Sequence, residues 1–183
     1  MAMSDALILV DIQNDYFAGG TMELTGMAMA CDLARMVLGS FRKHRAPLFH
    51  IQHLAVKPDA LFFVPNTHGV EHHEATKPNA SEVVIQKNFP NAFRGTDLEE
   101  QLRAKGIEHL VIVGAMSHMC IDATTRAAFD LGFRCTVVHD ACATRDLVFN
   151  KQTIPAQQVH ASFMAALSAP YASVVSCTKY LMG

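Results

Sequence analysis

Short apolar runs alternate along the chain with segments in which apolar residues recur every three or four positions. A short apolar run fits a buried strand, and recurrence at helical spacing fits a helix packed on a sheet. Strands are predicted over residues 6–11, 47–53, 82–85, 109–113, 133–138 and 173–177, and helices over residues 29–41, 97–105, 119–131 and 153–167. This alternation predicts a Rossmann-like three-layer α/β/α sandwich with a six-stranded parallel sheet.

One long segment, residues 54–81, fits neither pattern. It contains Pro58, Pro65 and Pro78 together with three histidines. Irregular stretches of this length in compact domains are usually lids, binding loops or oligomer contacts. We expect this one to shape a substrate pocket within a single domain spanning residues 1–183.

Composition and charge narrow the classes of function. The net charge is −2 and the basic residues are scattered, so no nucleic-acid footprint is expected. No apolar stretch reaches the roughly 18 residues of a membrane span. The five cysteines are widely spaced and no export signal precedes them, which indicates reduced thiols in a cytoplasmic protein.

Three polar residues stand at or just after predicted strands. Asp11 follows ALILV, Lys87 follows VVIQ, and Cys120 comes shortly after VIVGA. Since doubly wound sheets carry their functional groups at the carboxyl ends of the strands, these three are candidates for one site. A thiol, a carboxylate and a cation there are the groups that amide or ester hydrolysis needs. Taken singly, each also fits an ordinary structural role, and Asp15 competes with Asp11.

Local context refines two of these candidates. Cys120 falls in the first turn of a predicted helix that Ser117 can cap, where backbone N–H groups would make the thiol unusually acidic. A small buried cysteine filling a gap between helix and sheet is the equal alternative. Asp11 is expected to be partly desolvated, which tends to raise the pKa of a carboxyl group and suits it to accept a proton.

Four ordered motifs, VDIQNDYF, QKNFPNAFRGTDLEEQLRAKGI, VIVGAMSHMCIDATTRAAFDLG and HDACATRD, resemble the isochorismatase-like hydrolases over nearly the whole chain. The resemblance implies a catalytic triad of Asp11, Lys87 and Cys120. It also implies a cis peptide between Ala115 and Met116, and an oxyanion hole made by the N–H groups of Met116 and Cys120.

The same resemblance leaves the reaction open among branches of the family. A cysteine at position 120 favours cleavage of a C–N bond, whereas a vinyl ether hydrolase of the isochorismatase type needs no thiol. A non-catalytic binding module on the same fold is a further alternative. Nicotinamidases carry a metal-binding Asp-x-His after the second strand, but here the aligned residues are Ile51, Gln52 and His53. No metal or other cofactor is therefore expected, although His53, His72 and His73 could form a site.

Aromatic residues near the three strand ends are candidates for the wall of a substrate pocket. They are Phe17, Phe63 and Phe93, and His118 beside the nucleophile joins them. Core packing is the competing interpretation for at least half of the aromatic side chains in these loops. The expected partners are a small-molecule substrate and further copies of the chain, since relatives are commonly dimers or tetramers.

Overall fold

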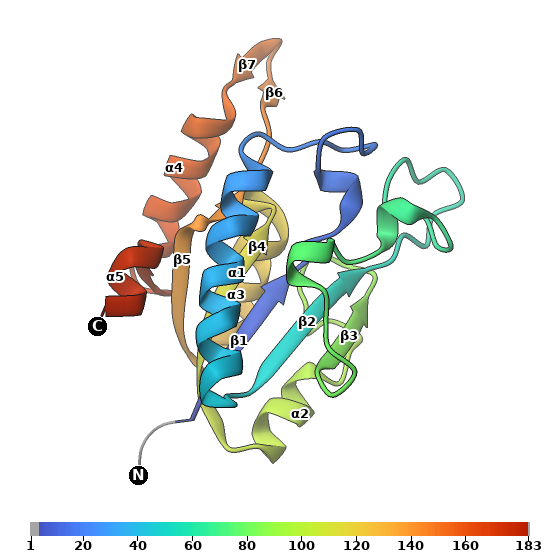
Figure 1. Ribbon diagram of the computed structural model, residues 1–183. Coiled ribbons are helices and arrows are strands. Elements are labelled where there is room, and N and C mark those ends of the chain that lie inside the picture. The colour runs from blue at the N-terminus through green and yellow to red at the C-terminus, as the bar shows by residue number, and fades with distance from the viewer. Residues whose placement is uncertain (1–3, 183) are drawn as a thin grey trace.

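A six-stranded parallel sheet lies at the centre of the computed structural model, which describes residues 4–182 (Figure 1). Its strands are β1 (Ser4–Val10), β2 (Leu48–His53), β3 (Val83–Lys87), β4 (Ile107–Ala115), β5 (Arg134–Ala143) and β8 (Ser173–Val175). They run in the order β3-β2-β1-β4-β5-β8 with every neighbouring pair parallel. The order reverses between β1 and β4, and functional crevices of such sheets open at the carboxyl ends of the strands beside that point.

Helices cover both faces of the sheet, which confirms the predicted three-layer sandwich (Figure 1). One face packs on α1 (Met27–His44) and α5 (Cys177–Met182), and the other on α2 (Leu98–Ala104), α3 (Asp122–Asp130) and α4 (Ala156–Leu167). Burial of both faces of strand β1 explains why its sequence is apolar throughout. Leu7 and Leu9 face the α1 layer while Ile8 and Val10 face the α2–α3 layer, and all four are buried.

The C-terminal third differs from the prediction in three places. Strand β5 continues to Ala143, five residues past its predicted end, and Cys177 begins helix α5 instead of ending a strand. The predicted helix start at Thr153 is wrong, because β6 (Leu147–Phe149) and β7 (Gln152–Ile154) form an antiparallel hairpin. Its two turn residues, Asn150 and Lys151, both have positive φ, as a tight hairpin turn requires. Lysine at such a position does not signal this turn in the sequence.

The irregular segment 54–81 is fastened to the loop after β1 by one buried carboxylate. Asp15 accepts hydrogen bonds from Phe63 N at 2.6 Å and from Thr21 Oγ1 at 2.8 Å. Gly69 lies so close that an added Cβ would come 2.1 Å from Asp15 Oδ1. Asp15, which competes with Asp11 in the sequence, therefore has a structural role. Two short 3₁₀ turns, His68–Val70 and Glu74–Thr76, are the regular structure of this segment.

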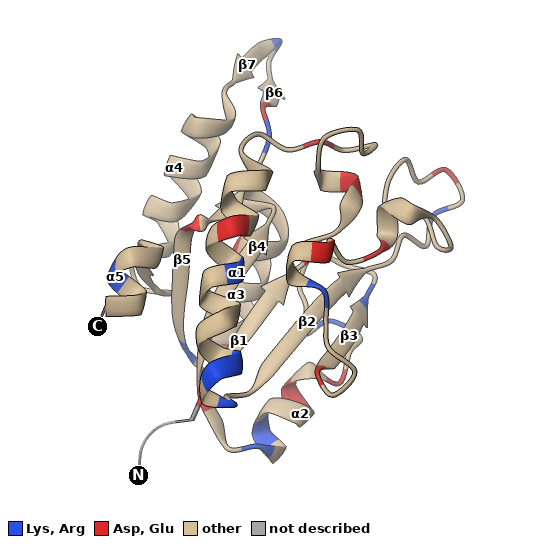
Figure 2. Cartoon of the chain, in the orientation of Figure 1, with Lys and Arg blue, Asp and Glu red and all other residues tan. Residues whose placement is uncertain are grey.

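Charged residues of both signs are distributed over the elements, without massing of Lys and Arg on one of them (Figure 2). Within residues 4–182, no helix is long and apolar enough to cross a membrane.

Candidate active site

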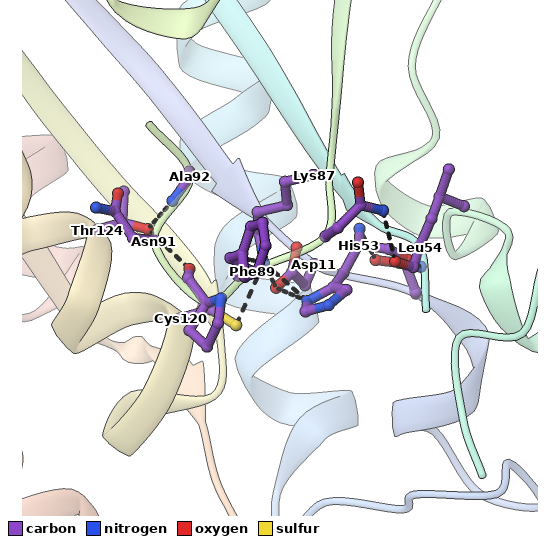
Figure 3. Close-up of polar contacts among 12 residues, drawn as sticks. Asp11, His53, Leu54, Lys87, Phe89, Asn91, Ala92, Cys120 and Thr124 are labelled. Carbon is purple, nitrogen blue, oxygen red and sulfur yellow. Dashed lines mark hydrogen bonds and ion pairs between the residues drawn. The ribbon is translucent and has the colours of Figure 1, made fainter. Parts of the chain in front are cut away.

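Four adjacent strands end in the polar residues of one buried cluster (Figure 3). In sheet order, Lys87 ends β3, His53 ends β2, Asp11 follows β1, and Cys120 follows β4 after a short loop. Asp11, Lys87 and Cys120 are exposed to 0, 1 and 2%. The structure thus brings together the three residues that the strand-end rule selected.

The Lys87 ammonium group lies at the centre of this cluster. It donates hydrogen bonds to His53 Nδ1 at 2.9 Å, to the Phe89 carbonyl at 3.0 Å and to Cys120 Sγ at 3.4 Å. Asp11 Oδ2 lies 2.8 Å from the same nitrogen as an ion pair. Lysine has three N–H donors, and here they face four acceptors. The hydrogen not taken by His53 and Phe89 is therefore shared between Cys120 Sγ and Asp11 Oδ2.

Asp11 is held in a special backbone conformation directly after β1. Its φ is +52°, a left-handed value that aspartate tolerates better than most residues. Burial raises the pKa of this carboxyl group, but the nearby Lys87 charge and the neighbouring side chains outweigh burial, so the pKa lies below its usual value. The expectation of a raised pKa is wrong, because the sequence did not show how close Lys87 lies. The carboxylate remains ionised and able to accept a proton.

Cys120 occupies a π-helical turn, Ser117–Ile121, that leads into α3. Burial, followed by the negative charge of Asp11, raises the pKa of its thiol, and Lys87 offsets only part of this effect. The expected acidic thiol is therefore wrong for the resting protein. The proton stays on sulfur, with a carboxylate and an ammonium group beside it.

The loop before Cys120 contains the cis peptide between Ala115 and Met116 that the family resemblance implied. Ser117 does not cap the following helix as expected. Its hydroxyl instead lies 3.2 Å from the carbonyl oxygen of Ala143 and 2.8 Å from His160 Nδ1. These contacts fasten the nucleophile loop to β5 and α4.

Gln13 and His53 hold one another in place in this cluster, and sequence analysis assigned neither of them to the catalytic site. The Gln13 side chain donates to the His53 carbonyl at 3.0 Å and accepts from the His53 N–H at 2.7 Å. It also donates to the Val70 carbonyl at 2.8 Å, so it joins the loop after β1 to β2 and to segment 54–81. The strand-end rule applied to the second strand would have found His53, which we considered only as a metal ligand.

The same geometry addresses the possible metal site. Asp11, His53 and Cys120 present ligand atoms within 4.8 Å of one another, which is close enough for a shared ion. The Lys87 nitrogen already lies between these atoms, so the arrangement fits the ammonium group of this lysine and does not fit a divalent metal. His73 stacks on Phe17, and the ring of His72 lies edge-on to that of His50. The three histidines do not converge.

The four pocket candidates lie in different surroundings. Phe17 borders a cavity of about 450 Å³ between the loop after β1 and segment 54–81. Phe63 is fully buried, with its ring centre 4.6 Å from that of Tyr16 and 5.6 Å from that of His53. Phe93 stacks on Phe133 in the core, and His118 lies 2.6 Å from Thr144 Oγ1. Phe17 thus borders a cavity, but Asp11, Lys87 and Cys120 do not line that cavity.

A parallel sheet with a carboxylate, a lysine and a cysteine meeting beside its reversal point agrees with what the resemblance to the isochorismatase-like hydrolases implied. The Isochorismatase domain family profile matches residues 5–176, and the chain belongs to this family, whose members are hydrolases.

Three relatives illustrate the similarity. The isochorismatase family protein YddQ of Bacillus subtilis is 48% identical over 179 residues, covering 98% of this chain and 99% of the relative. The crystal structure of an isochorismatase hydrolase from Oleispira antarctica superposes with a TM-score of 0.96 at 46% identity, covering 100% and 98% of the two chains. A streptothricin hydrolase of Streptomyces noursei is 35% identical over 142 residues, covering 78% of this chain and 50% of the relative.

Proposed function

We propose that this hydrolase cleaves a C–N bond of the amide type in a small molecule, through a thioester on Cys120. The observation that carries the proposal is the contact of one buried ammonium group, on Lys87, with both Cys120 Sγ and Asp11 Oδ2. A thiol with a proton acceptor and a fixed positive charge beside it is equipped for nucleophilic catalysis. The similarity to streptothricin hydrolase adds support.

In the first half of the reaction, the proton on Cys120 moves to Asp11, whose carboxylate lies beside both the sulfur and Lys87. The sulfur attacks the substrate carbonyl carbon and forms a C–S bond, while Lys87 stabilises the charge that develops on sulfur. The oxyanion accepts hydrogen bonds from the N–H groups of Met116 and Cys120. The C–N bond then breaks, and the leaving nitrogen takes the proton from Asp11.

In the second half, Asp11 accepts a proton from a water molecule that attacks the thioester carbonyl. The C–S bond breaks, the carboxylic acid leaves, and the sulfur regains a proton from Asp11. Because the pKa of Asp11 is lowered and that of Cys120 is raised, proton transfer in the free protein is uphill. We therefore expect thiolate to form together with the attack on substrate and not beforehand.

Our proposal extends to the cofactor, the partners and the location of the enzyme. The reaction needs no metal or organic cofactor, since the Lys87 ammonium group supplies the positive charge. The substrate is a small molecule, and the enzyme acts in the cytoplasm as a homo-oligomer without nucleic-acid or membrane partners. A cysteine beside a carboxylate and a lysine favours amide cleavage over vinyl ether cleavage, for which an acid alone suffices.

The test is a panel of primary amides, ureides and lactams with detection of released ammonia or amine, run on wild type and two variants. Cys120→Ala should lose turnover of any substrate found, while Cys135→Ala should keep it, since Cys135 is a buried core thiol whose hydrogen bonds go to the backbone carbonyls of Thr125 and Phe133. Mass spectrometry of rapidly quenched reactions should find the acyl group on Cys120. Full turnover by Cys120→Ala would overturn the proposal, and vinyl ether cleavage by that variant would establish the alternative.

A further inference from the structure

The imidazole of His53 has a defined orientation in the buried cluster. Its Nδ1 lies 2.9 Å from Lys87 Nζ, and a lysine ammonium group can only donate. Nδ1 must therefore be without a proton, and the remaining ring proton resides on Nε2. Gln13 holds the His53 backbone through two hydrogen bonds, so the ring is presented to Lys87 from a fixed point at the end of β2.

The consequence for Lys87 follows from counting its donors. Three N–H groups face four acceptors, and His53 Nδ1 and the Phe89 carbonyl take two of them. The third is shared between Asp11 Oδ2 at 2.8 Å and Cys120 Sγ at 3.4 Å. A carboxylate that receives only a share of one lysine hydrogen retains more of its affinity for a proton than one that receives a full hydrogen bond.

We propose that His53 is a positioning residue that takes one Lys87 hydrogen and so leaves a single hydrogen to be shared between Asp11 and Cys120. Without an acceptor at Nδ1, the ammonium group would turn to donate to the carboxylate, which already lies within 2.8 Å. Asp11 would become a weaker base, and the emerging thiolate would lose its donor. This role rests on the proposed cysteine chemistry and adds to it a residue outside the Asp–Lys–Cys set.

The test is the rate of Cys120 alkylation by iodoacetamide as a function of pH. Brief labelling and peptide mass mapping measure this rate. His53→Leu and His53→Asn have similar shapes, but only asparagine keeps an acceptor near the position of Nδ1. His53→Leu should alkylate about tenfold more slowly at neutral pH, as expected when a buried charged donor loses its partner, with the midpoint shifted to higher pH. His53→Asn should stay near wild type.

A matched control is His109→Leu. His109 also makes two side-chain contacts, with Asp5 at 3.0 Å and Thr136 at 2.9 Å, but it lies on β4 toward the other end of the sheet. It should leave both the rate and the midpoint unchanged. A folded His53→Leu protein with the wild-type rate and midpoint would overturn the proposal.

A second measurement covers the case in which His53→Leu does not fold. Nitrogen-15 NMR of the wild-type imidazoles reports which ring nitrogen carries the proton, and a protonated Nδ1 on His53 at neutral pH would contradict the proposal. Alkylation needs no substrate, so its outcome is separate from that of the amide panel. If amide hydrolysis is ruled out but alkylation still depends on His53, the proposed function would be overturned and the positioning role would stand.

Discussion

At the scale of single residues, the site combines one buried ion pair with one protonated thiol. The side chains of Asp11 and Lys87 are both fully buried, and their charges cancel. Buried charges are tolerated when they are paired, although such pairs often add little stability compared with apolar residues. We infer that this pair serves the chemistry, because the Lys87 ammonium group also contacts the sulfur of Cys120.

Removal of one member of the pair should therefore cost more than removal of both. Lys87→Met leaves the Asp11 carboxylate buried without a counter-charge, and we expect a loss of about 3–5 kcal/mol in the free energy of unfolding. The double variant Asp11→Asn/Lys87→Met should recover most of that loss while remaining inactive. Urea unfolding of wild type, both single variants and the double variant measures the coupling. Losses that simply add would show that the two charges do not interact.

At the scale of elements, strands β1 and β4 approach closely beside the site. Gly114 has a φ of +123°, and an added Cβ would lie 2.0 Å from the Val10 carbonyl oxygen. The next residue of each strand leads into the site, through Asp11 on one side and Ala115 with the cis peptide on the other. Glycine at position 114 thus sets the spacing at which Asp11 and the Cys120 loop face each other.

Gly114→Ala should destabilise the protein by roughly 2–4 kcal/mol, through a forced backbone shift and an unfavourable φ. It should also reduce activity, because the shift falls between the two site-bearing strands. Gly39→Ala is the matched control. It lies exposed within α1 with no heavy atom near the added Cβ, and should stabilise the protein by about 0.5–1 kcal/mol. Thermal unfolding measures both, and equal effects would contradict this account.

Glu82, just before β3, ties three elements together. Its carboxylate accepts two hydrogen bonds from Arg42 on α1, at 2.7 and 2.8 Å, and lies 2.9 Å from both His50 Nε2 on β2 and the backbone N–H of Asn79. Burial raises the pKa of Glu82, but the bonds from Arg42, Asn79 and His50 outweigh burial and lower it from 4.5 to about 2.

A lowered pKa makes this contribution depend on acidity. The stabilisation is fully present above pH 4.5, the ordinary pKa of a glutamate in the unfolded chain, and is lost as the pH falls through about 2. Glu82→Gln cannot titrate, so its unfolding free energy should vary less between these pH values than that of wild type. Urea unfolding at several acidic pH values compares the two proteins. Parallel curves would show that Glu82 does not contribute in this way.

At the scale of the whole molecule, all five cysteines are free and buried, and the sulfur of Cys120 accepts a hydrogen bond from a buried lysine ammonium group. Burial raises the pKa of Cys31 to about 11 and that of Cys135 and Cys142 to about 12, and it also raises that of Cys177. These four thiols lie in the two layers of core that hold helices on the sheet.

Labelling with iodoacetamide should therefore separate the thiols into two groups. Cys120 should react in the folded protein, because Asp11 accepts its proton and Lys87 stabilises the charge on sulfur while the sulfur attacks the reagent. The other four should react only after unfolding, so their labelling should follow the urea transition. Peptide mass mapping across a urea series measures this. Labelling of Cys135 ahead of Cys120 without denaturant would contradict the activated role of Cys120.

Local patterns determined much of this protein before any tertiary information. The apolar runs located all six strands of the sheet, because a buried parallel strand must be apolar on both faces. The strand-end rule then selected Asp11, Lys87 and Cys120, since parallel strands bring their carboxyl ends to one edge. The motifs around these residues indicated the family and the cis peptide after Ala115.

Only the tertiary structure decided what depends on distances between strands far apart in sequence. The order β3-β2-β1-β4 puts His53 between Lys87 and Asp11, and pairing of distant segments is invisible to local periodicity. The pKa shifts of Asp11 and Cys120 are opposite in direction to those expected from the sequence, for the same reason. Each shift depends on the balance between burial and a nearby charge, and the chain order does not reveal where that charge lies. Ser117 likewise found its partner on α4, 43 residues away, instead of in its own helix.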